Sequence, residues 1–128
     1  MQDTYNINDT ISFVGLGKLG LPLATIFAKN NIDIIGIDKN KDLINLLNEN
    51  KVPFYEDGLE ENLDKSKENI TYTFDYEGVM DKSDVSIILV NTQIGDSYSS
   101  EYVVSALTDL CDELKNSKKP YHLFILSS

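Results

Sequence analysis

Apolar and polar positions follow two different periods along the chain, and the pattern predicts alternating strands and helices. Short apolar runs, many of them β-branched, predict strands over 11–15, 33–37, 70–74, 85–90 and 121–126. Apolar residues at helical spacing predict helices over 18–30, 40–50, 58–67 and 100–116. Alternation of this kind favours an α/β fold in which helices cover both faces of a parallel sheet.

Length and composition indicate a single globular domain. A chain of 128 residues, 41% of them hydrophobic, can bury roughly two-thirds of its unfolded surface. Residues 1–9 are polar and are expected to form a frayed lead-in, which leaves 10–128 for the domain. The net charge of −10 argues against nucleic acid or an anionic membrane as partner, and no apolar run could span a bilayer. We therefore expect a soluble, cytoplasmic protein.

The chain has one cysteine and one histidine, Cys111 and His122, which excludes an internal disulfide and a Cys/His zinc cluster. No metal site is expected. His122 begins the last predicted strand and is expected to be structural. Cys111 is expected to face the sheet as a small hydrophobe, among apolar residues at helical spacing: Val103, Val104, Leu107, Leu110, Cys111 and Leu114.

A glycine-rich turn joins the first predicted strand to the first helix. Residues 15–20 read G-x-G-x-x-G, which in this position is typical of a dinucleotide-binding βαβ unit. Gly15 would allow the tight turn, and Gly17 would let a pyrophosphate approach the backbone. Gly20 would let the helix pack closely on the strand. The motif predicts a Rossmann-type, doubly wound parallel sheet.

Three further residues complete this predicted site. The N–H groups of Lys18 and Leu19 would face the phosphates at the positive end of the helix. Asp38 follows the second strand, where a carboxylate binds the hydroxyls of the adenosine ribose and repels a 2′-phosphate, so we expect NAD rather than NADP. The alternative is an ordinary turn acid. Only five strands are predicted where the full fold has six, so we expect a sheet truncated after strand 5, in a fragment of a longer protein.

Four segments resemble the NAD-binding domain of the UDP-glucose/GDP-mannose dehydrogenase family, from about residue 11 to the end. They are Gly15–Ala24, Pro53–Glu61, Val90–Thr92 and Leu126–Ser128. The connector Pro53–Glu61 is the most specific, because most dinucleotide folds lack a P-x-x-E-x-G-L segment there. Its acid Glu56 could either face solvent or have a functional role, and the sequence favours neither.

Two positions depart from the family pattern. Gln93 stands where the family usually has proline, so the cofactor contacts of that loop are expected to differ. Leu43 stands where a basic residue is common, and Lys39 or Lys41 could reach the same region.

The resemblance implies an enzyme that oxidises the C6 alcohol of a UDP-sugar to a carboxylate with two NAD, for polysaccharide biosynthesis. It also implies a homodimeric parent protein, and cofactor contacts from Asn91 and Thr92, although Thr92 could instead cap a turn. The family's catalytic cysteine, lysine and carboxylate lie beyond this region, as does most of the sugar site. No catalytic residue is therefore expected in this chain, which alone should be inactive.

Two other functions fit parts of the sequence. A β-hydroxyacid dehydrogenase has a similar opening motif, but the Pro53–Glu61 connector and the Asn91-Thr92 pair count against it. A nucleotide-sensing regulatory domain of potassium-transport systems shares the glycine motif and the strand-end acid. Such a domain proceeds quickly from its second helix to the next strand, whereas some nineteen residues separate Lys51 from Ile70 here.

Overall fold

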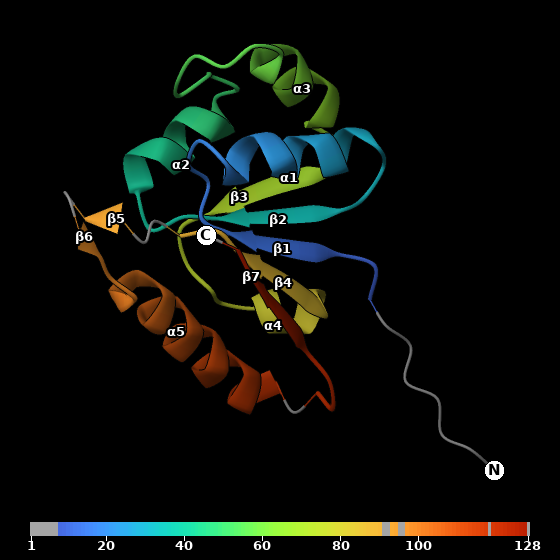
Figure 1. Cartoon of the computed structure of the whole chain (residues 1–128). Helices are drawn as coiled ribbons and strands as arrows, with labels where there is room; N and C mark the ends of the chain where they lie inside the picture. Colours follow the sequence, from blue (N-terminus) through green and yellow to red (C-terminus); the bar gives the residue numbers. More distant parts are fainter. Residues whose placement is uncertain (1–7, 91–92, 95–96, 118, 128) are drawn as a thin grey trace.

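A five-stranded, fully parallel sheet forms the centre of the molecule, with strand order β3-β2-β1-β4-β7 (Figure 1). The computed structural model describes residues 8–90, 93–94, 97–117 and 119–127. Its sheet strands are β1 (Ile11–Val14), β2 (Ile34–Ile37), β3 (Ile70–Thr73), β4 (Val85–Ile88) and β7 (Leu123–Leu126). This order places β1 at the centre and reverses the direction of winding between β1 and β4. The predicted Rossmann-type fold is thereby confirmed.

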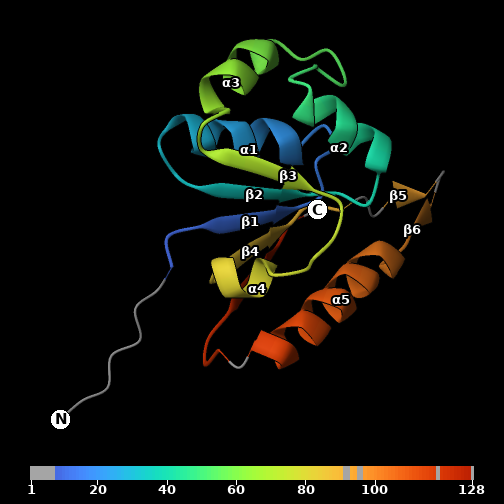
Figure 2. The same ribbon diagram turned by 180° about the vertical axis from the view of Figure 1, so that it is seen from behind.

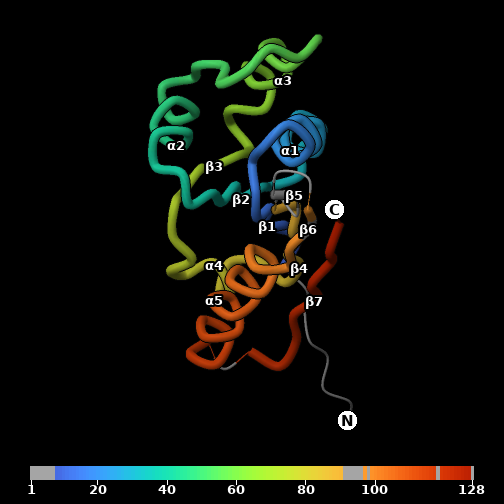
Figure 3. Tube along the Cα trace, turned by 60° about the vertical axis from the view of Figure 1, so that its left-hand side comes forward, coloured from blue at the N-terminus to red at the C-terminus, as the bar shows by residue number. Residues whose placement is uncertain are grey.

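Helices cover both faces of this sheet. One face carries α1 (Gly20–Lys29), α2 (Lys41–Asn48) and α3 (Leu59–Ser66), and the other carries α4 (Val79–Lys82) and α5 (Glu101–Ser117). The two views of the ribbon and the tube view show the same three layers (Figures 2 and 3). Layers of this kind follow from strands that are apolar on both sides and need cover on both.

Each face of the sheet has its own apolar core. Phe13 and Leu21 belong to the core beneath α1, where the rings of Phe13 and Phe27 meet edge to face at 5.5 Å. Val14 and Leu110 belong to the core beneath α5. Neighbouring residues of β1 thus point into different cores, as the alternation of side chains along a strand requires.

The connector between α2 and α3 packs against the molecule rather than projecting from it. Val52 and Phe54 lie against the core beneath α1, whereas Glu56 is exposed. The backbone oxygen of Glu56 accepts a hydrogen bond from the N–H of Leu59 at 3.1 Å, which begins α3. Gly58 precedes that helix with φ of +83°, a conformation that favours glycine.

Three elements were not predicted from the sequence. They are the four-residue helix α4 and the antiparallel pair formed by β5 (Gln93–Ile94) and β6 (Ser97–Tyr98). Each is too short to show a hydrophobic period. The predicted helix over 18–30 begins later, at Gly20, because residues 17–19 form the turn itself.

The predicted burial of Cys111 is wrong, since Cys111 is exposed. Residues 103, 106, 107, 110 and 114 form the stripe of α5 that turns toward the sheet, with Ala106 and Leu110 fully buried. Cys111 lies one residue past Leu110, about 100° further round the helix. Val104 is also exposed, so the predicted apolar face is too wide and only one of its two overlapping stripes faces the sheet.

Strand β7 forms an open edge of the sheet. It pairs with β4 on one side, and no other strand of the described residues lies on its other side. Leu123, Ile125 and Leu126 are 43%, 42% and 54% exposed. The apolar side chains of this strand are therefore only half covered.

The described residues contain neither a membrane-spanning helix nor a metal-binding cluster. None of the described helices is both long enough and apolar enough to cross a membrane. Within the same residues, no group of three or more His, Cys, Asp or Glu side chains could hold a metal ion.

Candidate nucleotide-binding site

The glycine-rich turn lies at the carboxyl end of β1, where the first and third glycines are required by close contacts. Gly15 has φ of +101°, and a Cβ there would lie 2.6 Å from the backbone oxygen of Leu89. A Cβ on Gly20 would lie 1.9 Å from the backbone oxygen of Gly15. The predicted tight turn and the predicted close packing of helix on strand are both confirmed.

Gly17 differs from these two glycines because it faces open space. A Cβ there would meet no atom within 4 Å, and Gly17, Lys18 and Leu19 are all exposed. Within the part of the chain that the structure describes, the N–H groups of Lys18 and Leu19 form no hydrogen bond. Two unpaired donors beside open space at the start of α1 make a suitable place for an anion.

Asp38 follows β2 and turns toward the same loop. Its Oδ2 accepts a hydrogen bond from the N–H of Leu16 at 2.9 Å, and its Oδ1 accepts one from the N–H of Asn40 at 2.9 Å. The carboxylate therefore holds the glycine-rich turn and its own turn together. A carboxylate offers about four acceptor positions, so two remain for the hydroxyl groups of a ligand.

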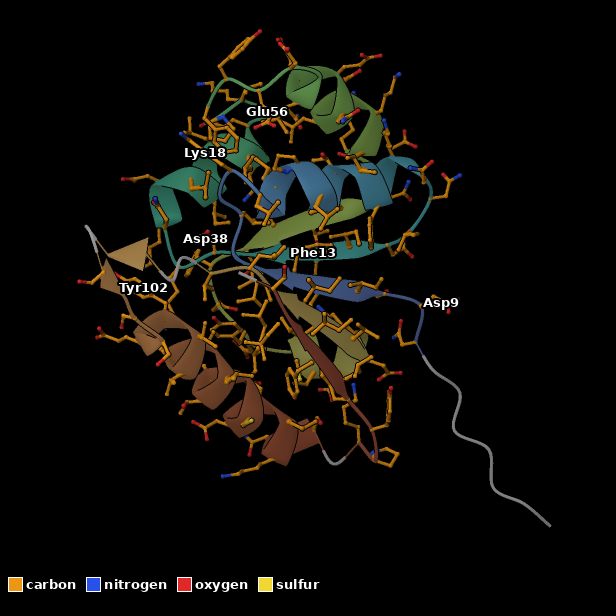
Figure 4. All side chains as sticks on the ribbon, viewed as in Figure 1. Asp9, Phe13, Lys18, Asp38, Glu56 and Tyr102 are labelled. Carbon is orange, nitrogen blue, oxygen red and sulfur yellow. The ribbon has the colours of Figure 1, made fainter. Side chains whose placement is uncertain are left out.

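The site residues lie together at one end of the sheet. Figure 4 shows Lys18, Asp38 and Tyr102 at the end toward which the strands run, with Asp9 at the opposite end. In open α/β sheets, ligands bind in the crevice outside the carboxyl ends of the strands, where the winding reverses. Here that point lies between β1 and β4, directly beside the glycine-rich turn.

The two lysines near Asp38 are both engaged elsewhere. Lys39 Nζ lies 3.0 Å from Asp109 Oδ2 of α5, and Lys41 Nζ lies 4.9 Å from the centre of the Phe74 ring. Leu43 packs against the core beneath α1. The contacts of these three side chains are therefore with other parts of the molecule than the glycine-rich turn.

Tyr76 lines the same hollow as Asp109 of α5. Its side chain is almost fully buried, and burial raises its pKa to about 12, with the charges of Asp109 and Asp38 as further causes. The phenol is therefore neutral at physiological pH. Its side chain belongs to the apolar core beneath α5.

His122 lies outside this crevice, near the amino ends of the strands. Lys119 Nζ lies 3.1 Å from its Nδ1, and its Nε2 lies within hydrogen-bond distance of Ser86 Oγ, at 2.8 Å. Ser86 Oγ in turn lies 2.6 Å from Ser12 Oγ. Burial and the Lys119 charge lower the pKa of His122 to about 4, against the opposing charge of Asp84. These contacts join β1, β4 and the segment before β7.

Two predicted cofactor contacts, Asn91 and Thr92, lie outside the described residues. For Gln93 the structure gives the backbone, which pairs with that of Tyr98 in the short antiparallel pair. Glu56 is exposed, and the hydroxyl of the neighbouring Tyr55 donates to Asp57. The described contact of Glu56 is that of its backbone oxygen with the N–H of Leu59.

Sequence reasoning missed three residues around the crevice. Tyr76, Tyr102 and Asp109 come from loops and from α5, far along the chain from the glycine-rich turn. Nothing in the sequence around Asp109 indicates that its partner is Lys39, which lies far away along the chain. The only available signal was the aromatic residue Tyr102 in the first turn of a helix that follows a strand end.

Comparisons with known proteins agree with this geometry. A family model described as the UDP-glucose/GDP-mannose dehydrogenase family, NAD binding domain, matches residues 9–128. The GDP-mannose 6-dehydrogenase of Pseudomonas putida is 30% identical over 123 residues, which is 92% of this chain and 28% of that protein. UDP-glucose 6-dehydrogenase AglM of Haloferax volcanii is 27% identical over 121 residues, with the same two shares.

A solved structure gives the same result in three dimensions. The crystal structure of a ternary complex of GDP-mannose dehydrogenase from Pseudomonas aeruginosa superposes with a TM-score of 0.83 at 27% identity. The match covers 91% of this chain and 27% of that one, so this chain spans about a quarter of the length of these relatives.

These matches support the nucleotide-sugar dehydrogenase family over the two alternatives, a β-hydroxyacid dehydrogenase and a nucleotide-sensing regulatory domain. The matched range, residues 9–128, includes both the glycine-rich turn and the strand-end acid Asp38. The chain is a member of the UDP-glucose/GDP-mannose dehydrogenase family and forms its NAD-binding domain.

Proposed function

We propose that NAD binds across the carboxyl edge of the sheet, with its pyrophosphate at the glycine-rich turn and its adenosine ribose at Asp38. The open space at Gly17 and the N–H groups of Lys18 and Leu19 support the first contact. The remaining acceptor positions of Asp38 support the second. Asn91 and Thr92 would add contacts from the end of β4.

The observation that carries this proposal is the hydrogen bond from Leu16 N–H to Asp38 Oδ2. It joins the turn that would hold the pyrophosphate to the acid that would hold the ribose, so both lie within the span of one nucleotide. NAD would supply a hydride acceptor. The residues of this chain would bind and orient it.

For the whole protein we propose the oxidation of the C6 alcohol of a nucleotide sugar, with a UDP-sugar as the first candidate. The named relatives act on UDP-glucose and GDP-mannose, which supports this class of substrate. A cytoplasmic homodimer that serves polysaccharide biosynthesis would fit such an enzyme. The sugar site and the catalytic groups would lie mainly in the parts of these relatives that this chain does not cover.

Calorimetric titration of the 128-residue chain with NAD, NADP and UDP-glucose tests the proposal. We expect NAD to bind more tightly than NADP, and Asp38→Asn to narrow that preference on the order of tenfold. The amide keeps an oxygen for Leu16 N–H but removes the charge that repels a 2′-phosphate. Asp33→Asn, at the other end of β2, is the matched control and should change neither affinity.

Tighter binding of NADP than of NAD by the unmodified chain would show that Asp38 does not have this role. If Asp38→Asn and Asp33→Asn change the ratio of the NAD and NADP affinities equally, the proposal is also contradicted. The effect would then come from the loss of any acid near β2 and not from the acid in the crevice.

A further inference from the structure

Lys39 and Asp38 are neighbours in the chain, but their side chains extend in different directions. The Asp38 carboxylate faces the glycine-rich turn through Leu16 N–H. Lys39 extends to α5, where Nζ lies 3.0 Å from Asp109 Oδ2 and donates to Ser105 Oγ at 3.2 Å. The acid thus stays at the crevice while the adjacent cation is held on a helix.

This arrangement bears on the difference between NAD and NADP, which is a single 2′-phosphate on the adenosine ribose. Sites that accept the phosphate place a basic side chain near the end of the second strand. Lys39 occupies such a position. Released from α5, its ammonium could offset the charge of Asp38 and pair with the phosphate.

We propose that Asp109 is a specificity-determining residue: by holding Lys39 on α5, it keeps this cation away from a 2′-phosphate and maintains the preference for NAD. The inference rests on the proposed function, in which Asp38 holds the adenosine ribose. Asp109 acts through Lys39 and is therefore a positioning residue.

Other contacts at the same rim agree with this role. Lys39 follows Asp38 in the chain and pairs with Asp109, so the two carboxylates lie on the same side of the molecule. The hollow beside Tyr76 and Asp109 has a volume of about 320 Å³ and is lined otherwise by acids: Asp75, Glu77, Asp112 and Glu113. Asp109 is thus one of several acids on this surface, and the one that pairs with Lys39.

The ion pair is exposed to solvent, with the side chains of Lys39 and Asp109 58% and 41% exposed. Exposed pairs change an equilibrium by up to about fivefold. Release of Lys39 should therefore shift the affinity for NADP measurably without inverting the preference. Lys41, held over Phe74, is unchanged in every variant below.

The test is calorimetric titration of the 128-residue chain and its variants with NAD and with NADP. Asp109→Asn is expected to lower the NADP dissociation constant about twofold to fivefold and to leave that for NAD within about 1.5-fold. In the Lys39→Ala background the same substitution should give no gain, because no cation is released. Asp112→Asn, which removes an equal charge from the same helix, is the matched control.

The outcomes separate this inference from the proposed function. If the unmodified chain binds NAD but Asp109→Asn leaves the ratio of the two affinities unchanged, this inference alone is overturned. A gain that persists without Lys39, or that Asp112→Asn reproduces, also overturns it, because removal of charge would then suffice. Failure of the unmodified chain to bind NAD overturns the proposed function and this inference with it.

Discussion

Asp84 and Lys119 form an almost fully buried ion pair, with Asp84 Oδ1 2.5 Å from Lys119 Nζ and side-chain exposures of 3% and 8%. The ammonium also donates to the backbone oxygens of Met80 at 2.8 Å and Ser83 at 2.5 Å. The charge and the hydrogen-bonding needs of this lysine are therefore satisfied inside the protein. The contacts fasten the segment before β7 to the amino end of β4.

Lys119→Met should destabilise the domain strongly, because it leaves the Asp84 carboxylate buried without its cation. The expected loss is about 3 to 5 kcal/mol in the free energy of unfolding, measured by urea denaturation. Lys65→Met is the matched control, since Lys65 pairs with Glu61 on the exposed face of α3 and its loss should change the free energy of unfolding far less. Equal losses in the two variants would contradict this account of Asp84.

His122 should make the domain less stable in mild acid. Its ordinary pKa is 6.5, and burial with the Lys119 charge lowers it to about 4. Between these two pH values the unfolded chain binds a proton that the folded chain does not bind, so stability falls as the pH falls from about 6.5 to 4. Above pH 6.5 the histidine contributes no such dependence.

The comparison of wild type with His122→Gln isolates this effect from that of the carboxylates. Urea midpoints measured at pH 7 and pH 5 should fall further for the wild type than for the variant. The same fall in both proteins would assign the acid sensitivity to other groups.

The first and third glycines should respond to substitution differently from the second. Gly17→Val adds a side chain in open space, so the thermal midpoint should change little while NAD binding is lost. Gly20→Ala places a Cβ 1.9 Å from Gly15 O and should cost about 1 to 3 kcal/mol or more, because the helix must move. Thermal unfolding and NAD titration of both variants check this. Unchanged NAD affinity in a folded Gly17→Val chain would show that the glycine-rich turn is not part of the NAD-binding site.

Cys111 should react in the folded state, because it is exposed. We expect a maleimide reagent to label it without denaturant, and Cys111→Ala to change the free energy of unfolding by no more than about 0.5 kcal/mol. We also expect the chain alone to form no NADH from NAD and a UDP-sugar. Steady NADH formation that is lost in Cys111→Ala would assign this thiol a catalytic role.

The parts of the structure that were predictable have local signatures. The turn at 15–20 and Asp38 carry a fixed spacing, and the five sheet strands are rich in apolar and β-branched residues. The register of α5 was not predictable, because Val103 and Val104, like Leu110 and Cys111, offer two apolar stripes. Tertiary packing selected one of them.

The polar contacts were unpredictable for a different reason. Ser12 and Ser86 are 74 residues apart, and Lys39 and Ser105 are 66 apart. Pairs of this kind depend on strand order and helix placement, which a single sequence does not encode in any short window. Serine, lysine and aspartate are also usually exposed, so nothing marks these particular ones as buried or paired.

The half-covered edge at β7 has a consequence for how copies of this chain behave toward one another in solution. An edge strand with exposed leucine and isoleucine side chains is a template for pairing with another copy. A net charge of −10 keeps copies apart, but this repulsion weakens as salt shortens the Debye length from about 30 Å at 0.01 M to about 3 Å at 1 M. Light scattering at constant protein concentration should therefore rise with ionic strength, and Ile125→Lys should suppress that rise.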